Sequence, residues 1–109
     1  MKRGEIYWAN LNPVIGSEQG GIRPVLIVQN RKGNHYAPTV TVCTITHSLK
    51  KRNLPTHVCI YEPLNVESVV QCEQLRTVDK SRILRKIGKL KPYQMKKVNK
   101  ALKTQLELY

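Results

Sequence analysis

The chain has 109 residues, of which 40% are hydrophobic and 24% are charged, a length and composition typical of one globular domain. Its 19 Lys and Arg against seven Asp and Glu give a formal net charge of +12, which favours a polyanionic partner, either nucleic acid or acidic protein. No apolar run approaches the roughly 18 residues of a membrane span and no secretory signal is evident, so we expect a single domain, residues 1–109, in the cytoplasm.

Short apolar and β-branched runs, separated by turn residues, fill the first three quarters of the chain and predict strands. Pro24 is acceptable at the first position of its strand. Within 39–46, Thr alternates with Val and Ile, which predicts one buried face and one exposed face that carries Thr44 and Thr46. The predicted strands are 6–11, 24–29, 40–46, 57–60 and 69–75.

The pattern changes toward the C-terminus. Asp79 is suited to cap a short helical turn at 80–84, and a brief strand is predicted at 86–90. From Pro92 onward, apolar residues fall three or four positions apart, which predicts an amphipathic helix. Its apolar face consists of Met95, Val98, Leu102 and Leu106. We therefore predict one α+β domain, rich in β structure, with an amphipathic C-terminal helix.

Basic residues are concentrated in two segments. Residues 80–103 contain ten Lys and Arg and no Asp or Glu, which is typical of either a solvated helix face or a surface for a polyanion. The predicted loop at 47–56 carries Lys50, Lys51 and Arg52. These three side chains are candidates for contacts with RNA phosphates.

The three cysteines do not resemble a metal site. Cys43, Cys59 and Cys72 form no C-x-x-C pair and lack paired histidines at zinc-finger spacing. Each lies in an apolar run, where a free cysteine acts as a small buried hydrophobe, and an odd number argues against a disulfide framework. We expect no bound metal.

A turn-rich segment, residues 12–22, precedes Arg23 and contains three glycines, which either permit tight turns or form a binding loop. The guanidinium of Arg23 offers a fork of donors that matches a phosphate, and the hydroxyl of Thr46 could donate to a phosphate oxygen. Each signal is weak alone, because such an Arg is often a surface ion pair and Thr is a good strand former.

Four segments, in order, resemble the MazF (PemK-like) toxin family. Together they extend over most of the chain. They are residues 3–8 (RGEIYW), 16–26 (GSEQGGIRPVL), 54–58 (LPTHV) and 73–80 (EQLRTVDK). The resemblance implies an SH3-like barrel that acts as a homodimer without metal or cofactor. It implies a toxin of a type II toxin–antitoxin system, an endoribonuclease that cuts single-stranded RNA at short motifs. The partner implied is a MazE-like antitoxin with an acidic, disordered tail.

The resemblance also implies roles for individual residues. Arg23 and Thr46 match the family's catalytic pair, whereas Ser17, Glu18 and Gln19 match the loop over the active site. Gln74 matches a position near the bound bases, and we add Arg76, in the same motif, as a candidate RNA contact.

The implied reaction is attack by the 2′-hydroxyl, which gives a 2′,3′-cyclic phosphate and a 5′-hydroxyl. Arg23 is better suited to stabilise the phosphorane than to act as the base, since a guanidinium stays protonated in proteins and has no lone pair to accept a proton. Thr46 would hold a nonbridging oxygen. Glu18 and His47 are the titratable candidates for proton transfer. Strand alternation turns His47 away from the face of Thr46, so we favour a surface or RNA-contact role for it.

Two other classes of protein remain as alternatives. One is a noncatalytic toxin of the same fold that binds DNA gyrase, as CcdB does, and the other is a small basic RNA-binding module. The segment 16–24 favours the nuclease, and the lack of Phe and the small number of Tyr in basic context disfavour the module. The remaining histidines, His35 and His57, are interpreted as surface and packing residues.

Overall fold

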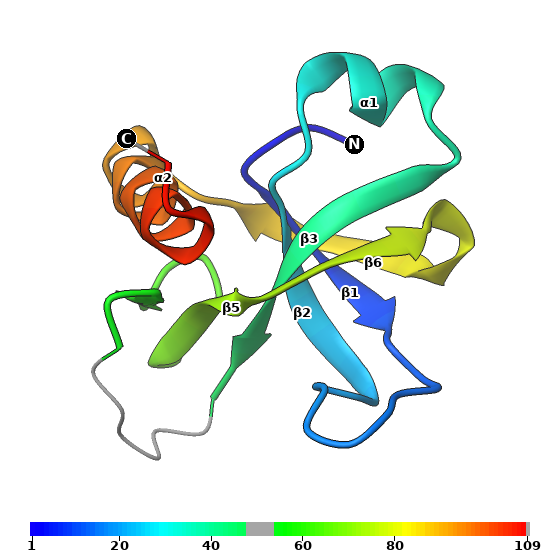
Figure 1. Ribbon diagram of the computed structural model, residues 1–109, viewed down its shortest axis with the longest axis horizontal. Helices are drawn as coiled ribbons and strands as arrows, with labels where there is room; N and C mark the ends of the chain where they lie inside the picture. Colours follow the sequence, from blue (N-terminus) through cyan, green and yellow to red (C-terminus); the bar gives the residue numbers. More distant parts are fainter. Residues whose placement is uncertain (48–53, 109) are drawn as a thin grey trace.

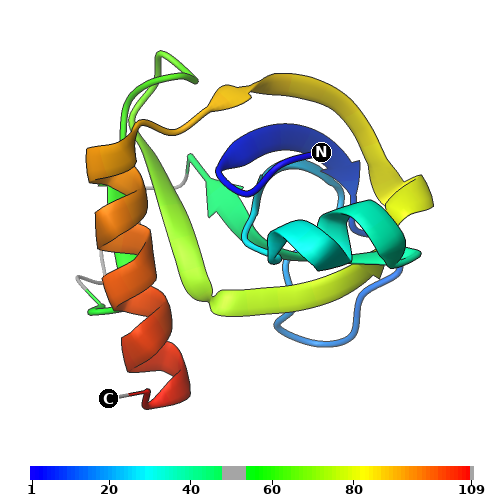
Figure 2. The same cartoon turned by 90° about the horizontal axis from the view of Figure 1, so that it is seen from above.

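Six strands form one antiparallel sheet in the order β4-β5-β3-β2-β1-β6 in this computed structural model, which describes residues 1–47 and 54–108. The sheet is strongly curved (Figures 1 and 2). A short helix joins β2 to β3, a 3-10 turn joins β5 to β6, and the chain ends with a longer helix. The elements are β1 Glu5–Asn10, β2 Ile22–Ile27, α1 Arg31–Tyr36, β3 Thr39–Thr46, β4 His57–Ile60, β5 Ser68–Asp79, η1 Lys80–Arg82, β6 Ile83–Lys89 and α2 Pro92–Leu106.

The strand β5 bends in its middle and so serves both halves of the sheet (Figure 2). Thr39 to Cys43 of β3 pair with Asp79 to Leu75, and Thr44 pairs next with Gln71. Residues 72–74 therefore have no partner on β3, and extra residues of this kind bend a strand. The strand extends to Asp79, well beyond the predicted end at residue 75.

Both faces of the sheet are covered. One apolar cluster, which includes Leu26, Ile45 and Val70, is packed by Val98 and Ala101 of α2. A second cluster fills the other face where the sheet curls over itself; its members include Val25, Ile27, Val40, Val42 and Val78. These features confirm the predicted β-rich α+β fold with its amphipathic C-terminal helix. The helix differs from the prediction at Leu106, which is 51% exposed.

Three sequence-based expectations were wrong. Thr44 and Thr46 are buried, at 0% and 6% exposure, because both faces of β3 are covered. Cys59 is exposed, whereas Cys43 and Cys72 are buried as expected. Pro24 is the third residue of β2, which is tolerated because β2 pairs with β3 only from the next residue onward.

The helix α1 was not predicted, because its sequence RKGNHY has no apolar period. Its stability comes from polar contacts instead. The Asn30 side chain accepts from the Gly33 amide as an N-cap, and Lys80 Nζ donates to the carbonyl oxygen of Asn34 at 2.7 Å. Neither α1 nor α2, the two helices of the part described, is long and apolar enough to cross a membrane.

Candidate active site

Arg23 and Arg76 hold the glycine-rich loop between β1 and β2 through hydrogen bonds to its backbone. Arg23 Nε donates to the carbonyl oxygen of Gly20 at 2.7 Å, and Arg76 Nη1 donates to that of Gln19 at 3.3 Å. Both arginine side chains are half-buried. Since charge-assisted hydrogen bonds are the stronger kind, the two guanidinium groups fix this end of the loop.

Asn12 fixes the other end of the loop. Its Oδ1 atom accepts from the amide of Gly21 at 3.0 Å, and its carbonyl oxygen accepts from Arg82. Gly21 has a φ of 79°, and a Cβ on Gly20 would lie 2.9 Å from the side chains of Asn12 and Val14. Gly21 is required by its positive φ, and Gly20 by the close approach of neighbouring side chains. The turn that they form directly precedes Arg23.

The strand register brings Arg23 to the same face as Thr46. Val25 of β2 pairs with Thr44 of β3 in an antiparallel ladder, and the same register two residues further would set Arg23 beside Thr46. Side chains two apart in a strand share a face. The two predicted catalytic residues, 23 positions apart in sequence, therefore lie on one face at one end of the sheet.

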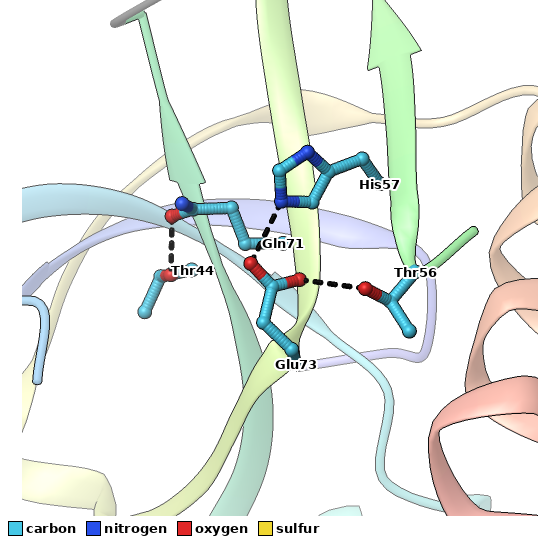
Figure 3. Close-up of polar contacts among 5 residues, drawn as sticks. All are labelled: Thr44, Thr56, His57, Gln71 and Glu73. Carbon is cyan, nitrogen blue, oxygen red and sulfur yellow. Dashed lines mark hydrogen bonds and ion pairs between the residues drawn. The ribbon is translucent and has the colours of Figure 1, made fainter. Parts of the chain in front are cut away.

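The same face continues as a polar row that the sequence did not reveal. Thr44 Oγ1 donates to Oε1 of Gln71 on β5 at 3.1 Å (Figure 3). Gln71 in turn pairs with His57 across β4 and β5. Buried hydroxyl and amide groups require such partners, so Gln71 explains how Thr44 is accommodated with no exposure.

Glu73 completes this row by contacting Thr56, which precedes β4, and His57, the first residue of β4 (Figure 3). Its Oε2 atom lies 2.7 Å from His57 Nε2, and its Oε1 atom accepts from Thr56 Oγ1 at 3.1 Å. His57 is thus part of a polar contact, not only the packing residue that was predicted. A carboxylate in the middle of a predicted strand was the one signal that could have indicated this cluster.

Other predicted site residues, Glu18, Ser17 and Gln74, form no hydrogen bond or ion pair with Arg23 within the described residues. Glu18 Oε1 accepts from the amide of Ile15 at 2.7 Å, so this carboxylate stabilises its own loop. Ser17 is exposed in the same loop, and Gln74 is half-buried in the bend of β5.

His47 points away from the face of Thr46, as strand alternation predicted. Its Nδ1 atom lies 2.9 Å from Ser68 Oγ, and that hydroxyl donates its proton to the carbonyl oxygen of Val66. Ser68 must then accept from His47 Nδ1, which leaves Nε2 as the acceptor of the neutral ring. The candidate RNA contacts Lys50, Lys51 and Arg52 lie outside the described residues.

The chemistry of this site is that of an anion-binding surface. Arg23 uses Nε for the loop, and its two terminal nitrogens have no hydrogen-bond partner within residues 1–47 and 54–108. A fork of two N–H donors beside a hydroxyl-bearing strand matches a phosphate. The described residues contain no group of three or more His, Cys, Asp or Glu that could hold a metal ion.

Comparisons with known proteins give a consistent result. Residues 2–106 match the family model described as PemK-like, MazF-like toxin of type II toxin-antitoxin system. The chain is 49% identical over 112 residues to the endoribonuclease MazF of Staphylococcus saprophyticus, which covers 100% of this chain and 93% of that protein.

Solved structures agree with these sequence matches. The crystal structure of MazF from Deinococcus radiodurans is similar with a TM-score of 0.87 and 27% identity, covering 99% of this chain and 97% of that one. An endoribonuclease in complex with its cognate antitoxin, from a mycobacterial species, has a TM-score of 0.85 and 28% identity over 100% of this chain and 97% of that one.

Proposed function

The chain belongs to the PemK-like, MazF-like toxin family of type II toxin–antitoxin systems, and we propose that its endoribonuclease reaction is centred on Arg23 and Thr46. The observation that carries this proposal is the geometry of Arg23. Its Nε atom is bound to the loop, which orients the remaining two nitrogens as a fixed fork. Donors that are fixed before the reaction stabilise developing charge without reorganisation.

The reaction proposed is an intramolecular transesterification of single-stranded RNA. The ribose 2′-oxygen forms a bond to phosphorus, and the bond from phosphorus to the 5′-oxygen breaks. The 2′-hydroxyl loses its proton to a base, and the departing 5′-oxygen gains one from an acid, which gives a 2′,3′-cyclic phosphate and a 5′-hydroxyl. Arg23 stabilises the phosphorane and Thr46 donates to a nonbridging oxygen. No step requires a metal.

Glu18 is the better candidate for the proton acceptor, and His47 the weaker one. The carbonyl of Gly20, which binds Arg23, belongs to the same loop as Glu18. The second carboxylate oxygen of Glu18 is not needed for its bond to Ile15 and would be available to a substrate hydroxyl. His47, by contrast, is bound to Ser68 on the other side of the sheet.

The proposed partners follow from family membership and from charge. A similar endoribonuclease is known in complex with its cognate antitoxin. We expect a MazE-like antitoxin with an acidic, disordered tail to bind this chain, whose net charge is +12. We also propose that the toxin acts as a homodimer in the cytoplasm. The gyrase-binding alternative is disfavoured because the matched relatives are endoribonucleases.

Substrate replacement tests the reaction directly. The purified protein is incubated with a mixed-sequence RNA in chelator, and cleavage sites are mapped from the fragment ends. A second RNA carries a 2′-methoxy group at each mapped site. We expect cleavage in chelator of the first RNA and none of the second, while binding of both persists. Cleavage of the methoxy RNA, or activity that returns only with magnesium, would show that an activated water is the nucleophile.

A further inference from the structure

Two basic hollows lie at the opposite end of the sheet from Arg23. β2 runs away from Arg23 to Ile27, and β3 returns from Thr39 to Thr46, so α1 between them is at the far end of both strands (Figure 1). Arg23 and Ile27 are separated by about 14 Å along the strand, at roughly 3.4 Å per residue. The N-terminal residues also lie at this end, since the amide of Gly4 donates to the carbonyl oxygen of Ile27.

The first hollow lies between α1 and the N-terminal segment. It has a volume of about 940 Å³, and none of its lining residues is acidic. Four of the lining residues are cationic: Lys2, Arg3, Arg31 and Lys32. Uncompensated positive charge in a concave surface concentrates the field and attracts polyanions.

The second hollow adjoins the first, because Lys2 and Arg3 line both. It has a volume of about 720 Å³ and adds Lys86, Lys89 and Lys91. Its one acidic residue, Glu5, is buried and paired with Lys86. The two hollows thus form one basic band, which contains seven of the 19 Lys and Arg and one of the seven Asp and Glu.

Several cations of the basic band are not used by the fold. Arg3 binds the carbonyl oxygen of Val28 and Oδ1 of Asn99, and so it is structural. Lys91 pairs with Glu62. By contrast, no hydrogen bond or ion pair to another described residue is present for four side chains: Lys2, Arg31, Lys32 and Lys89. These four are available to a ligand.

One exposed tyrosine lines the first hollow, and a second is the sequence neighbour of a residue that lines the second hollow. Tyr36 lines the first hollow and is 80% exposed, and its ring meets that of His35 edge-on with centroids 4.4 Å apart. Tyr93, which follows Pro92 of the second hollow, is 58% exposed. Aromatic rings beside cations are the combination on which single-stranded nucleic acids stack.

The platform that carries Tyr36 is held in place by specific contacts. Asn34 Nδ2 donates to the carbonyl oxygen of Gln29 at 3.0 Å, and Gln29 Nε2 donates to that of Thr39 at 3.1 Å. A Cβ on Gly33 would meet the Gln29 side chain at 2.9 Å, so the helix is packed closely on this residue. The backbone that carries Arg31 and Lys32 is therefore held at one place on the sheet.

We propose that the basic band is an accessory binding site for single-stranded RNA, which holds a substrate segment outside the cleavage centre. This inference rests on the proposed function for the identity of the substrate. The exposed tyrosines favour RNA over an acidic polypeptide, because carboxylates need only the cations whereas bases also use the rings. The site raises affinity for long RNA and leaves the chemical step unchanged.

RNA binding by charge-reversed variants tests the site. Wild type and the double variant Arg31→Glu, Lys32→Glu are titrated with a short 2′-methoxy RNA and with the same RNA extended at both ends. We expect the variant to bind the long RNA roughly 10-fold more weakly, with a salt dependence reduced by about 1.4 in log–log slope for two lost phosphate contacts. Binding of the short RNA and the saturating cleavage rate of its unmodified form stay unchanged.

The control is Lys96→Glu, Lys103→Glu, which changes the net charge equally at exposed positions of α2 outside both hollows. Tyr36→Ala should weaken long-RNA binding by about 5-fold without any change of charge. An equal loss of long-RNA affinity in the control variant would show that net charge alone causes the effect, and would overturn the proposal. The proposal would also be overturned if Arg31→Glu, Lys32→Glu bound RNA like the wild type but bound polyglutamate more weakly, because the surface would then be one for a polypeptide.

The binding assay does not depend on cleavage, because the methoxy RNA is not a substrate for the proposed reaction. Failure of the wild-type protein to cut RNA would therefore contradict the proposed function, while the length-dependent loss of binding would still decide the accessory site.

Discussion

Arg23 and Arg76 donate to the carbonyl oxygens of two consecutive residues, Gly20 and Gln19. Two guanidinium groups thus converge beneath one loop, and neither has an acidic partner among the described residues. Like charges brought together in this way repel each other, and a bound phosphate relieves that repulsion. The loop therefore holds two guanidinium groups, one from β2 and one from β5, close to the place where a phosphorane would form.

Arg23→Lys is expected to abolish most cleavage although it keeps the charge. A lysine cannot bind the Gly20 carbonyl and a phosphate with a planar fork at the same time. We expect a loss of about 100-fold or more in single-turnover rate, with unchanged thermal unfolding. Arg85→Lys, at an exposed position of β6, is the matched control. A near wild-type rate for Arg23→Lys would show that charge alone suffices.

Thr46→Val tests the proposed hydroxyl contact with the phosphate. The substitution keeps the β-branched shape at a buried position and removes one donor. We expect the single-turnover rate to fall by about 10- to 1,000-fold, as when one transition-state hydrogen bond is lost. Thr41→Val, on the opposite face of β3, should leave the rate unchanged. Equal rates for wild type and Thr46→Val would remove this residue from the mechanism.

Glu73→Ala is expected to destabilise the protein. The substitution leaves the buried Thr56 hydroxyl without the acceptor seen in the structure and releases His57. An orphaned buried donor costs about 1–3 kcal/mol, which urea unfolding at neutral pH would measure. Thr56→Ser retains a hydroxyl and should lose much less. If Glu73→Ala unfolds at the wild-type midpoint, the cluster contributes nothing to stability.

Glu5 predicts a specific dependence of stability on acid. Burial alone would raise its pKa, but hydrogen bonds from Lys86, the Lys2 amide and Tyr7 outweigh burial and lower the pKa from 4.5 to about 2. Because the folded-state pKa is depressed, this stabilisation is complete above the unfolded pKa and is lost as the pH falls from about 5 toward 2.

Glu5→Gln should therefore lower the free energy of unfolding by about 1–3 kcal/mol at pH 7 and by less at pH 3, as measured by urea denaturation. Glu67→Gln, at an exposed position, provides the control and should show no comparable difference. A constant effect of Glu5→Gln at the two pH values would contradict the assigned cause.

Local sequence patterns predicted most strands and the C-terminal helix, because their apolar periods are strong. They missed α1, whose cap and side-chain contacts with Gln29 and Lys80 depend on residues outside its own six positions. Arg23 and Thr46 were found through family motifs, and the β2–β3 register brings them to one face. The Glu73 cluster could not be predicted, since it exists only when β4 pairs with β5.

The bend at residues 72–74 ties the two apolar clusters to a single strand. Val70 and Cys72, before and within the bend, pack in one cluster, and Val78 packs in the other. Neither half of the barrel can open without withdrawing part of β5 from its place, so partial unfolding costs nearly as much as complete unfolding. The β5 amides that are hydrogen-bonded to β3 should thus exchange with solvent only through the global, cooperative transition.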